Sequence, residues 1–283
     1  MGLPGTAWSE QEQPQREPGF GQALARAFAG ALIFSLPLLM TMEMWWLGFV
    51  MEPGRLALLL ALFFPFLVAL SWHCGFEPTF RWRDDIVDAL VALAVGFACA
   101  LVVLALLGIL ERDLVLHDFV GKLCVQAIPG SIGALLAQTL LGQRKPEQVE
   151  RGGSSAYASE IFIMAVGALF LAFNMAPTEE MLHIAVRISA WHALALILAS
   201  LALMHAFVYS LAFRGQHDPR GASATSLFLR FTVVGYIVAL LLSAYLLWSF
   251  GRLEGLSLLN ALKSSVVLAL PASLGAAAAR LIL

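Results

Sequence analysis

Charged side chains are scarce in this sequence, since Asp, Glu, Lys and Arg make up only 13% of its 283 residues. Soluble domains average about 25%. Hydrophobic residues reach 60%, and the mean hydropathy is +0.83. One soluble core cannot bury that much apolar surface, so the composition excludes a soluble globular domain and favours a lipid bilayer. The net charge of −2 leaves no basic footprint for nucleic acid.

Signature motifs of familiar membrane enzymes and channels are also missing. The sequence has no Walker-type phosphate loop, HExxH, GxSxG, TVGYG-like filter or Arg-rich voltage-sensor helix. Its three cysteines, Cys74, Cys99 and Cys124, form no CxxC motif and have no His-rich neighbours, which excludes a disulfide framework or a zinc site. We therefore predict no catalytic residue, metal or cofactor from motifs.

Long apolar runs are abundant. A bilayer-spanning helix needs about 20 mostly apolar residues, and the runs lack the period-2 alternation of a barrel. The fold class predicted is an all-α polytopic membrane bundle with eight transmembrane helices. The eight runs are 27–50, 56–72, 86–110, 114–141, 156–188, 190–213, 227–250 and 256–283.

Lys and Arg beside the runs predict the orientation, because cytoplasmic loops carry an excess of them. Nine lie on one side: Arg16, Arg26, Arg81, Arg83, Arg144, Lys145, Arg151, Arg214 and Arg220. Four lie on the other: Arg55, Arg112, Arg187 and Arg252. Both termini are thus expected in the cytoplasm, with 1–22 as a flexible tail and 143–155 as a polar linker between 23–142 and 156–283.

The two halves resemble each other. Residues 30–44 align without gaps on 167–181, at an offset of 137, so that Gly, Thr, Glu and Met coincide. Other matches are Arg55/His73 with Arg187/His205, both 18 residues apart, and Pro-x-Ser-x-Gly-Ala at Pro129 and at Pro271. We predict two copies of one four-helix unit, related by a pseudo-twofold axis along the membrane normal.

Four ionisable residues inside the runs are the main pathway or binding candidates: Glu43, Glu180, Lys122 and Lys263. At a rise of about 1.5 Å per residue, all four lie roughly 10–12 Å below the outer surface. Each costs roughly 2.5–3.5 kcal/mol to insert, so we predict the pairs Glu43–Lys122 and Glu180–Lys263, or the exchanged partners. Such pairs either fix helix packing or line a pathway.

Other candidates are Glu179 and His183, one turn apart, and His73 and His205 near the inner face, which are able to relay protons or bond to headgroups. Pro37, Pro177, Pro129 and Pro271 are predicted helix breaks, since proline donates no backbone hydrogen bond. Proline beside a polar intramembrane residue indicates a broken helix and a binding cavity.

At TMEMWWLGF (41–49) and FNMAPTEEMLHIA (173–185) the sequence resembles a bacterial family of integral membrane proteins of unknown function. The resemblance covers most of the chain after the tail. It implies a bacterial inner-membrane protein and brings no activity and no catalytic residues.

Three function classes remain. The duplicated halves with an acid/base layer favour a transporter or channel for a small ion or solute. A signalling or assembly scaffold is the second class. The third is a membrane-embedded enzyme using Glu179, Glu180 and His183. The bilayer is the expected partner, and a homo-oligomer is left open.

Overall fold

The computed structural model describes residues 20–74, 82–110, 115–141, 156–211 and 224–282, and within these ranges the chain is helical and contains no strand. Eight of its helices are long and apolar enough to cross a membrane, which confirms the predicted fold class. The helices are α1 (Phe20–Leu39), α2 (Met42–Val50), α3 (Pro53–Cys74), α4 (Trp82–Leu106), α5 (Leu116–Leu141), α6 (Ala156–Met175), α7 (Glu179–Arg187), α8 (Ala190–Leu211), α9 (Ala224–Leu227), a π-helical turn η3 (Phe228–Val233), α10 (Val234–Ser249) and α11 (Leu258–Ile282).

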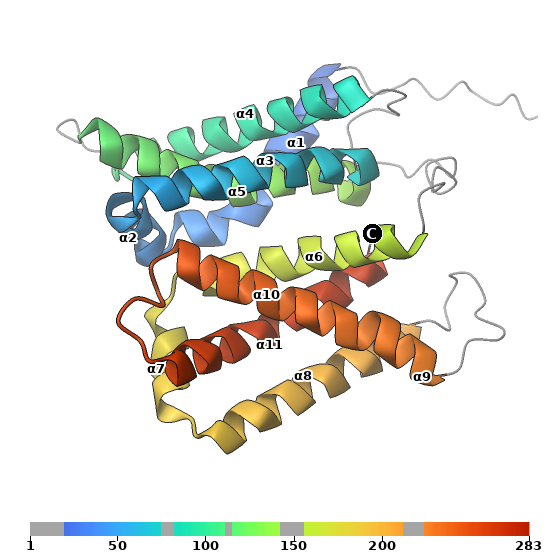
Figure 1. The fold of residues 1–283 in the computed structure, drawn as a ribbon. Helices are drawn as coiled ribbons and strands as arrows, with labels where there is room; N and C mark the ends of the chain where they lie inside the picture. Colours follow the sequence, from blue (N-terminus) through green and yellow to red (C-terminus); the bar gives the residue numbers. More distant parts are fainter. Residues whose placement is uncertain (1–19, 75–81, 111–114, 142–155, 212–223, 283) are drawn as a thin grey trace, which may run out of the picture.

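The first and fifth apolar runs are each two helices, where one was predicted. Helix α1 ends at Leu39, and the nine-residue α2 follows; α6 ends at Met175, and the nine-residue α7 follows. Thr41 and Thr178 precede the short helices in extended conformation, which an α-helix cannot contain. Both short helices lie at the same end of the bundle, and α7 runs across the direction of the long helices (Figure 1).

Each half is built around its last helix. Helix α5 packs against α1, α2, α3 and α4, and α11 packs against α6, α7, α8 and α10. Small residues let the backbones approach closely. A Cβ on Gly133 would overlap the backbone of Gly30 in α1, and a Cβ on Gly275 would overlap that of Gly167 in α6. Glycine is therefore required where these helices cross.

The helices of the two halves have matching boundaries. Helices α2 and α7 both have nine residues, α3 and α8 both have 22, and each pair is offset by 137 residues. The turns after α4 and α10 also match, because Gly108 and Gly251 both have a φ of 70° and the flanking backbone hydrogen bonds are the same at an offset of 143. These matches follow the predicted repeat, which stays a prediction.

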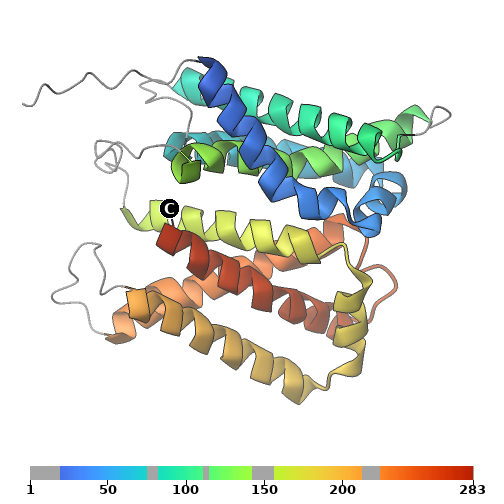
Figure 2. The same cartoon turned by 180° about the vertical axis from the view of Figure 1, so that it is seen from behind.

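The pseudo-twofold arrangement of the halves was predicted wrongly for the described helices. Helix α3 contacts α10, so a twofold axis would also bring α8 against α4, but those two helices lie on opposite outer flanks (Figures 1 and 2). The interface is instead heterologous, which means that different faces of the two halves meet. Arg55, which makes the α3–α10 contact, corresponds to His192 in α8, and His192 bonds to Ser189 in its own half.

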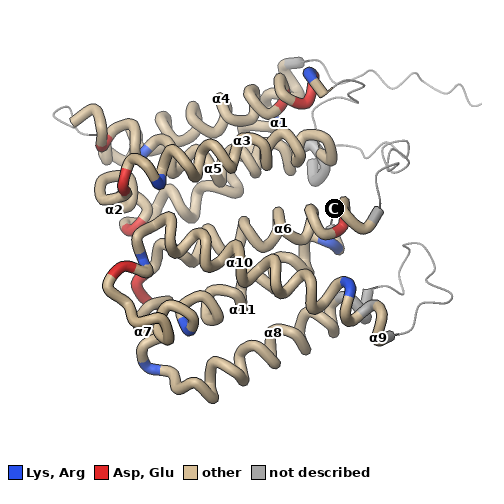
Figure 3. The backbone as a smooth tube through the Cα atoms, in the orientation of Figure 1, with Lys and Arg blue, Asp and Glu red and all other residues tan. Residues whose placement is uncertain are grey.

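Charged residues lie mostly towards the two ends of the bundle, and the middles of the long helices contain few of them (Figure 3). This distribution fits helices whose central parts lie in hydrocarbon, because an ionised group there is costly.

Candidate functional site

The two halves meet along a line of side-chain contacts that we call the seam. Helices α1 and α3 contribute Phe34, Arg55, Phe66 and His73, and the second half contributes Ser159, Phe162, Phe170, Trp248 and Glu254. Since these contacts come from helices far apart in sequence, the seam was not predicted as a set.

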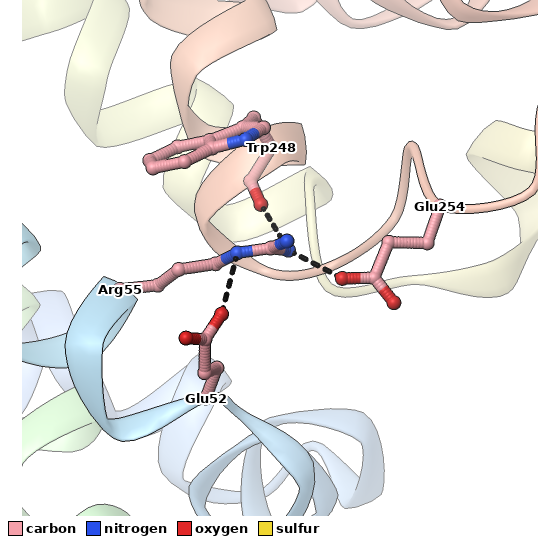
Figure 4. Close-up of polar contacts among 4 residues, drawn as sticks. All are labelled: Glu52, Arg55, Trp248 and Glu254. Atoms are coloured by element: carbon pink, nitrogen blue, oxygen red, sulfur yellow. Dashed lines mark hydrogen bonds and ion pairs between the residues drawn. The ribbon is translucent and has the colours of Figure 1, made fainter.

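At one end of the seam, Arg55 joins three groups (Figure 4). Its Nε lies 3.2 Å from a carboxylate oxygen of Glu52, and its Nη1 lies 2.7 Å from one of Glu254 and donates to the carbonyl of Trp248 at 3.0 Å. The guanidinium also lies 5.1 Å from the centroid of the Trp248 ring. Arg55 is only 19% exposed, whereas Glu52 and Glu254 are 66% and 67% exposed. Water therefore reaches the carboxylates, and the cluster can open at modest cost.

Aromatic rings fill the middle of the seam. Phe34 of α1 meets Phe170 of α6 edge to face, with centroids 4.9 Å apart, and Phe66 of α3 lies 5.2 Å from Phe162 of α6. Such pairs contribute about 0.5–1.5 kcal/mol each beyond their buried area.

At the opposite end of α3, His73 closes the seam. Its Nδ1 lies 2.8 Å from the Ala69 carbonyl, which only accepts, so in the neutral ring Nδ1 carries the proton. Its Nε2 then accepts a hydrogen bond from the Ser159 hydroxyl of α6 at 2.7 Å, and the ring stacks on Phe162. His73 thus bonds across the halves through its side chain.

The acidic candidates lie off the spanning helices. Because α1 and α6 end early, Glu43 and Glu180 belong to the first turns of α2 and α7. Glu179, Glu180 and His183 are exposed, and Glu43 is half-exposed. The continuous first and fifth helices predicted for the two glutamates are therefore wrong, and their depth in the membrane stays a prediction.

The predicted Glu–Lys pairs do not form among the residues that the structure describes. Lys263 Nζ instead donates to the carbonyl of Ile188, the C-cap of α7, at 2.8 Å, where the negative end of the helix dipole favours a cation. Lys122 packs its backbone and stem against Gly48 of α2. Aligned on Gly133 and Gly275, Lys263 corresponds to Gly121, so the two lysines occupy different faces.

The variants Glu43→Gln and Lys122→Met should therefore act independently. We expect their effects on unfolding in detergent to add within about 0.5 kcal/mol. The matched control is Glu160→Gln with Arg280→Met, whose side chains are ion-paired and should couple. If the effects of the Glu43 and Lys122 variants on unfolding are coupled as strongly as those of the control, the predicted Glu43–Lys122 pair would be supported.

The matched Arg/His spacing does not mark equivalent positions. Arg187 ends α7, whereas Arg55 lies in the first turn of α3. His205 lies within the second half, with Nδ1 3.3 Å from the Thr232 hydroxyl oxygen, whereas His73 bonds across the seam. The equal spacing of 18 residues is thus a coincidence of sequence.

The four prolines differ in effect. Pro177 lies in the break between α6 and α7, as predicted, and Pro37 lies in the last turn of α1, where its carbonyl accepts the Thr41 hydroxyl at 2.6 Å. Helices α5 and α11 continue through Pro129 and Pro271, so the breaks predicted there are wrong. Close packing on neighbouring helices keeps both straight enough to remain α-helical.

A partly buried ion pair was not predicted from the sequence. Arg280 in the last turn of α11 places Nε 3.0 Å and Nη2 2.8 Å from Glu160 Oε2 in α6, and its guanidinium lies 3.9 Å from the Phe231 ring centroid. The partners are 120 residues apart inside two apolar runs. In the sequence, the pair could have been suspected from one charged residue near an end of each run, Glu160 in 156–188 and Arg280 in 256–283.

Gln126 is a further polar group that was not predicted. It lies mid-way along α5, fully buried, and neither its amide nitrogen nor its amide oxygen has a partner among the residues that the structure describes. The corresponding residue of α11, at the offset that relates Gly133 to Gly275, is Leu268, which is also fully buried. Packing at this position therefore requires no amide.

Replacing Gln126 with leucine is expected to raise the free energy of unfolding by about 1–3 kcal/mol, because an unbonded buried amide is removed. The reciprocal change Leu268→Gln should lower it by a similar amount. Thermal unfolding in detergent measures both. A loss of stability in Gln126→Leu would contradict the claim that the Gln126 amide is buried without a hydrogen bond.

A family model with the description "Putative integral membrane protein (DUF2391)" matches residues 23–283. No curated protein and no solved structure matched the chain.

Proposed function

The chain belongs to this family of integral membrane proteins, and from that premise we propose that it is a transporter for a small ion or solute whose pathway follows the seam. The observation that carries the proposal is the contrast between tight packing within each half and separable contacts between the halves.

Within each half, helices touch backbone to backbone. Gly30 meets Gly133, Gly167 meets Gly275, and Gly48 meets Gly121, so none of these crossings can loosen without opening a packed interface. Such units move as rigid bodies.

Between the halves, each hydrogen bond, ion pair and ring contact described above uses at least one side chain. The two ends of the seam are polar, with Arg55 among carboxylates at one and His73 with Ser159 at the other. Hydrogen bonds and exposed ion pairs exchange with water at little net cost, whereas a backbone crossing does not. Rocking of one half against the other opens one end while the other stays closed, which is the general scheme of secondary transporters.

The charged residues predicted from the sequence lie around this proposed pathway. Glu43, Glu179, Glu180 and His183 surround the end of the bundle that carries α2 and α7 and attract or repel substrate there. Lys263 holds α7 in place through Ile188. The proposal includes an origin by duplication, supported by the matched helix boundaries, and a bacterial inner-membrane location with both termini in the cytoplasm, supported by the Lys and Arg distribution.

Flux into liposomes tests the proposal. Purified protein is reconstituted, and proton, sodium, potassium and chloride fluxes are compared with protein-free liposomes and with the variant Arg55→Glu, which repels Glu52 and Glu254. We expect flux of at least one ion with the wild type and altered flux with the variant. Absence of all four fluxes from correctly folded protein would reject transport of these ions.

A further inference from the structure

Three buried polar atoms at one end of α10 have no hydrogen-bond partner in the described part of the chain: the hydroxyl oxygens of Tyr245 and Ser249 and the Nε of Arg252. Tyr245 and Ser249 are one helical turn apart, and Arg252 follows in the turn after the helix. We infer that these three residues bind a small anionic group, either chloride or a carboxylate. The inference rests on the proposed function and names the class of substrate for its pathway.

Ser249 departs from the other serine of the same helix. Ser243 donates to the Ala239 carbonyl one turn earlier at 2.7 Å, the usual solution for a serine in an apolar helix. Ser249 is fully buried and makes no such bond. Its hydroxyl is available as a donor in a place where water is excluded.

Arg252 lacks the compensation that Arg55 has. Arg55 is paired with Glu52 and Glu254, whereas Arg252 is seen to donate only to the carbonyl of Pro177, between α6 and α7, and has no carboxylate within ion-pair distance among the described residues. The carbonyl groups at the C-terminal end of α10 offset part of the cost of a half-buried guanidinium without a carboxylate, and an anion would offset the rest. Guanidinium and hydroxyl groups supply the donors that an anion requires.

The other half shows that packing does not require these polar groups. The turns after α4 and α10 share their hydrogen bonds, and through that match the three residues correspond to Val102, Leu106 and Ile109. All three are apolar, and Leu106 is 81% exposed, whereas Ser249 is fully buried. We call Tyr245, Ser249 and Arg252 the polar stripe. It occurs only in the half in which this end of the helix is buried.

The stripe borders the seam. Trp248, between Ser249 and Tyr245 in sequence, contacts Arg55, and the rings of Tyr245 and Trp248 have centroids 6.2 Å apart. An anion at Arg252 would thus lie at the end of the seam that Arg55 closes.

Anion binding to the full chain in detergent tests the inference. The thermal unfolding midpoint is followed against chloride and, separately, against acetate, at constant ionic strength balanced with methanesulfonate. We expect saturable stabilisation by chloride, by acetate or by both. Arg252→Gln should weaken the apparent affinity at least about tenfold, and Ser249→Ala and Tyr245→Phe about three- to tenfold each. Ser243→Ala, whose hydroxyl bonds within its own helix, should leave it unchanged.

The outcomes separate the claims. Stabilisation by chloride alone assigns an inorganic anion, and stabilisation by acetate alone assigns the carboxylate of an organic solute. No saturable effect of either anion, or an affinity unchanged in Arg252→Gln, overturns the inference. If Arg252→Gln does not fold, the double variant Tyr245→Phe/Ser249→Ala decides in its place. Binding without flux supports the site and rejects only transport.

Discussion

Replacing Gly275 with alanine is expected to destabilise the second half by about 3 kcal/mol, the upper part of the range for overpacked interiors. Alanine is the better helix former by about 1 kcal/mol, so propensity alone predicts a gain. The new Cβ, however, would overlap the carbonyl oxygen of Gly167, and backbone atoms cannot move aside as a flexible side chain can. Helices α6 and α11 must separate, and each loses contacts along its buried face.

Matched variants isolate this effect. Gly133→Ala should cost about as much, because its Cβ would overlap the carbonyl oxygen of Gly30. Gly21→Ala places a Cβ in open space near the start of α1 and should leave the stability unchanged or slightly raised. Thermal unfolding in detergent compares the three. Equal stability of Gly275→Ala and Gly21→Ala would show that the helices do not cross at these glycines.

A reducible cross-link across the seam is expected to abolish transport, and its reduction to restore it. The variant Phe66→Cys/Phe162→Cys carries one thiol on α3 and one on α6, at positions whose ring centroids lie 5.2 Å apart, in a background where Cys74, Cys99 and Cys124 are replaced by alanine. A short bis-methanethiosulfonate reagent, which spans more than a direct disulfide, joins the two thiols through reducible disulfide bonds. A covalent link between the halves prevents them from rocking, so the loss should be at least about tenfold under the alternating scheme.

The control link lies within one half. With the same reagent, Phe173→Cys/Phe250→Cys joins α6 to the end of α10, where the ring centroids are also 5.2 Å apart. These helices move together in the proposed mechanism, so the control cross-link should leave flux near that of its reduced form. Cross-link formation is checked by gel mobility before flux is measured. Full flux through a cross-linked seam would exclude relative movement of the halves as part of transport.

The tight and the separable contacts follow one physical rule. Where glycines bring helix backbones together, as at Gly30 and Gly133, dispersion contacts are dense and lost together. Where Arg55 or His73 reaches across, each contact can be replaced by water. The difference between the two kinds of packing supports rigid halves with a movable boundary.

The sequence by itself determined that the chain lies in a membrane and how many helices cross it. Hydropathy is a property of contiguous residues, and a hydrocarbon layer requires each apolar run to satisfy its backbone within one helix. The runs 56–72 and 190–213 therefore predict α3 and α8 to within a few residues. The resemblance at 41–49 and 173–185 likewise agrees with the family match.

Only the tertiary structure decided where the apolar runs break and which side chains meet. Hydropathy averaged over a long run does not register a single residue in extended conformation, such as Thr41 before α2 or Thr178 before α7. Glu43 and Glu180 were therefore predicted on continuous helices that the structure divides. Arg55 was counted as a loop charge, yet it joins the halves through Trp248, 193 residues away. Such contacts depend on how helices rotate and cross, which is settled by packing between distant segments and leaves no periodic signal in either one.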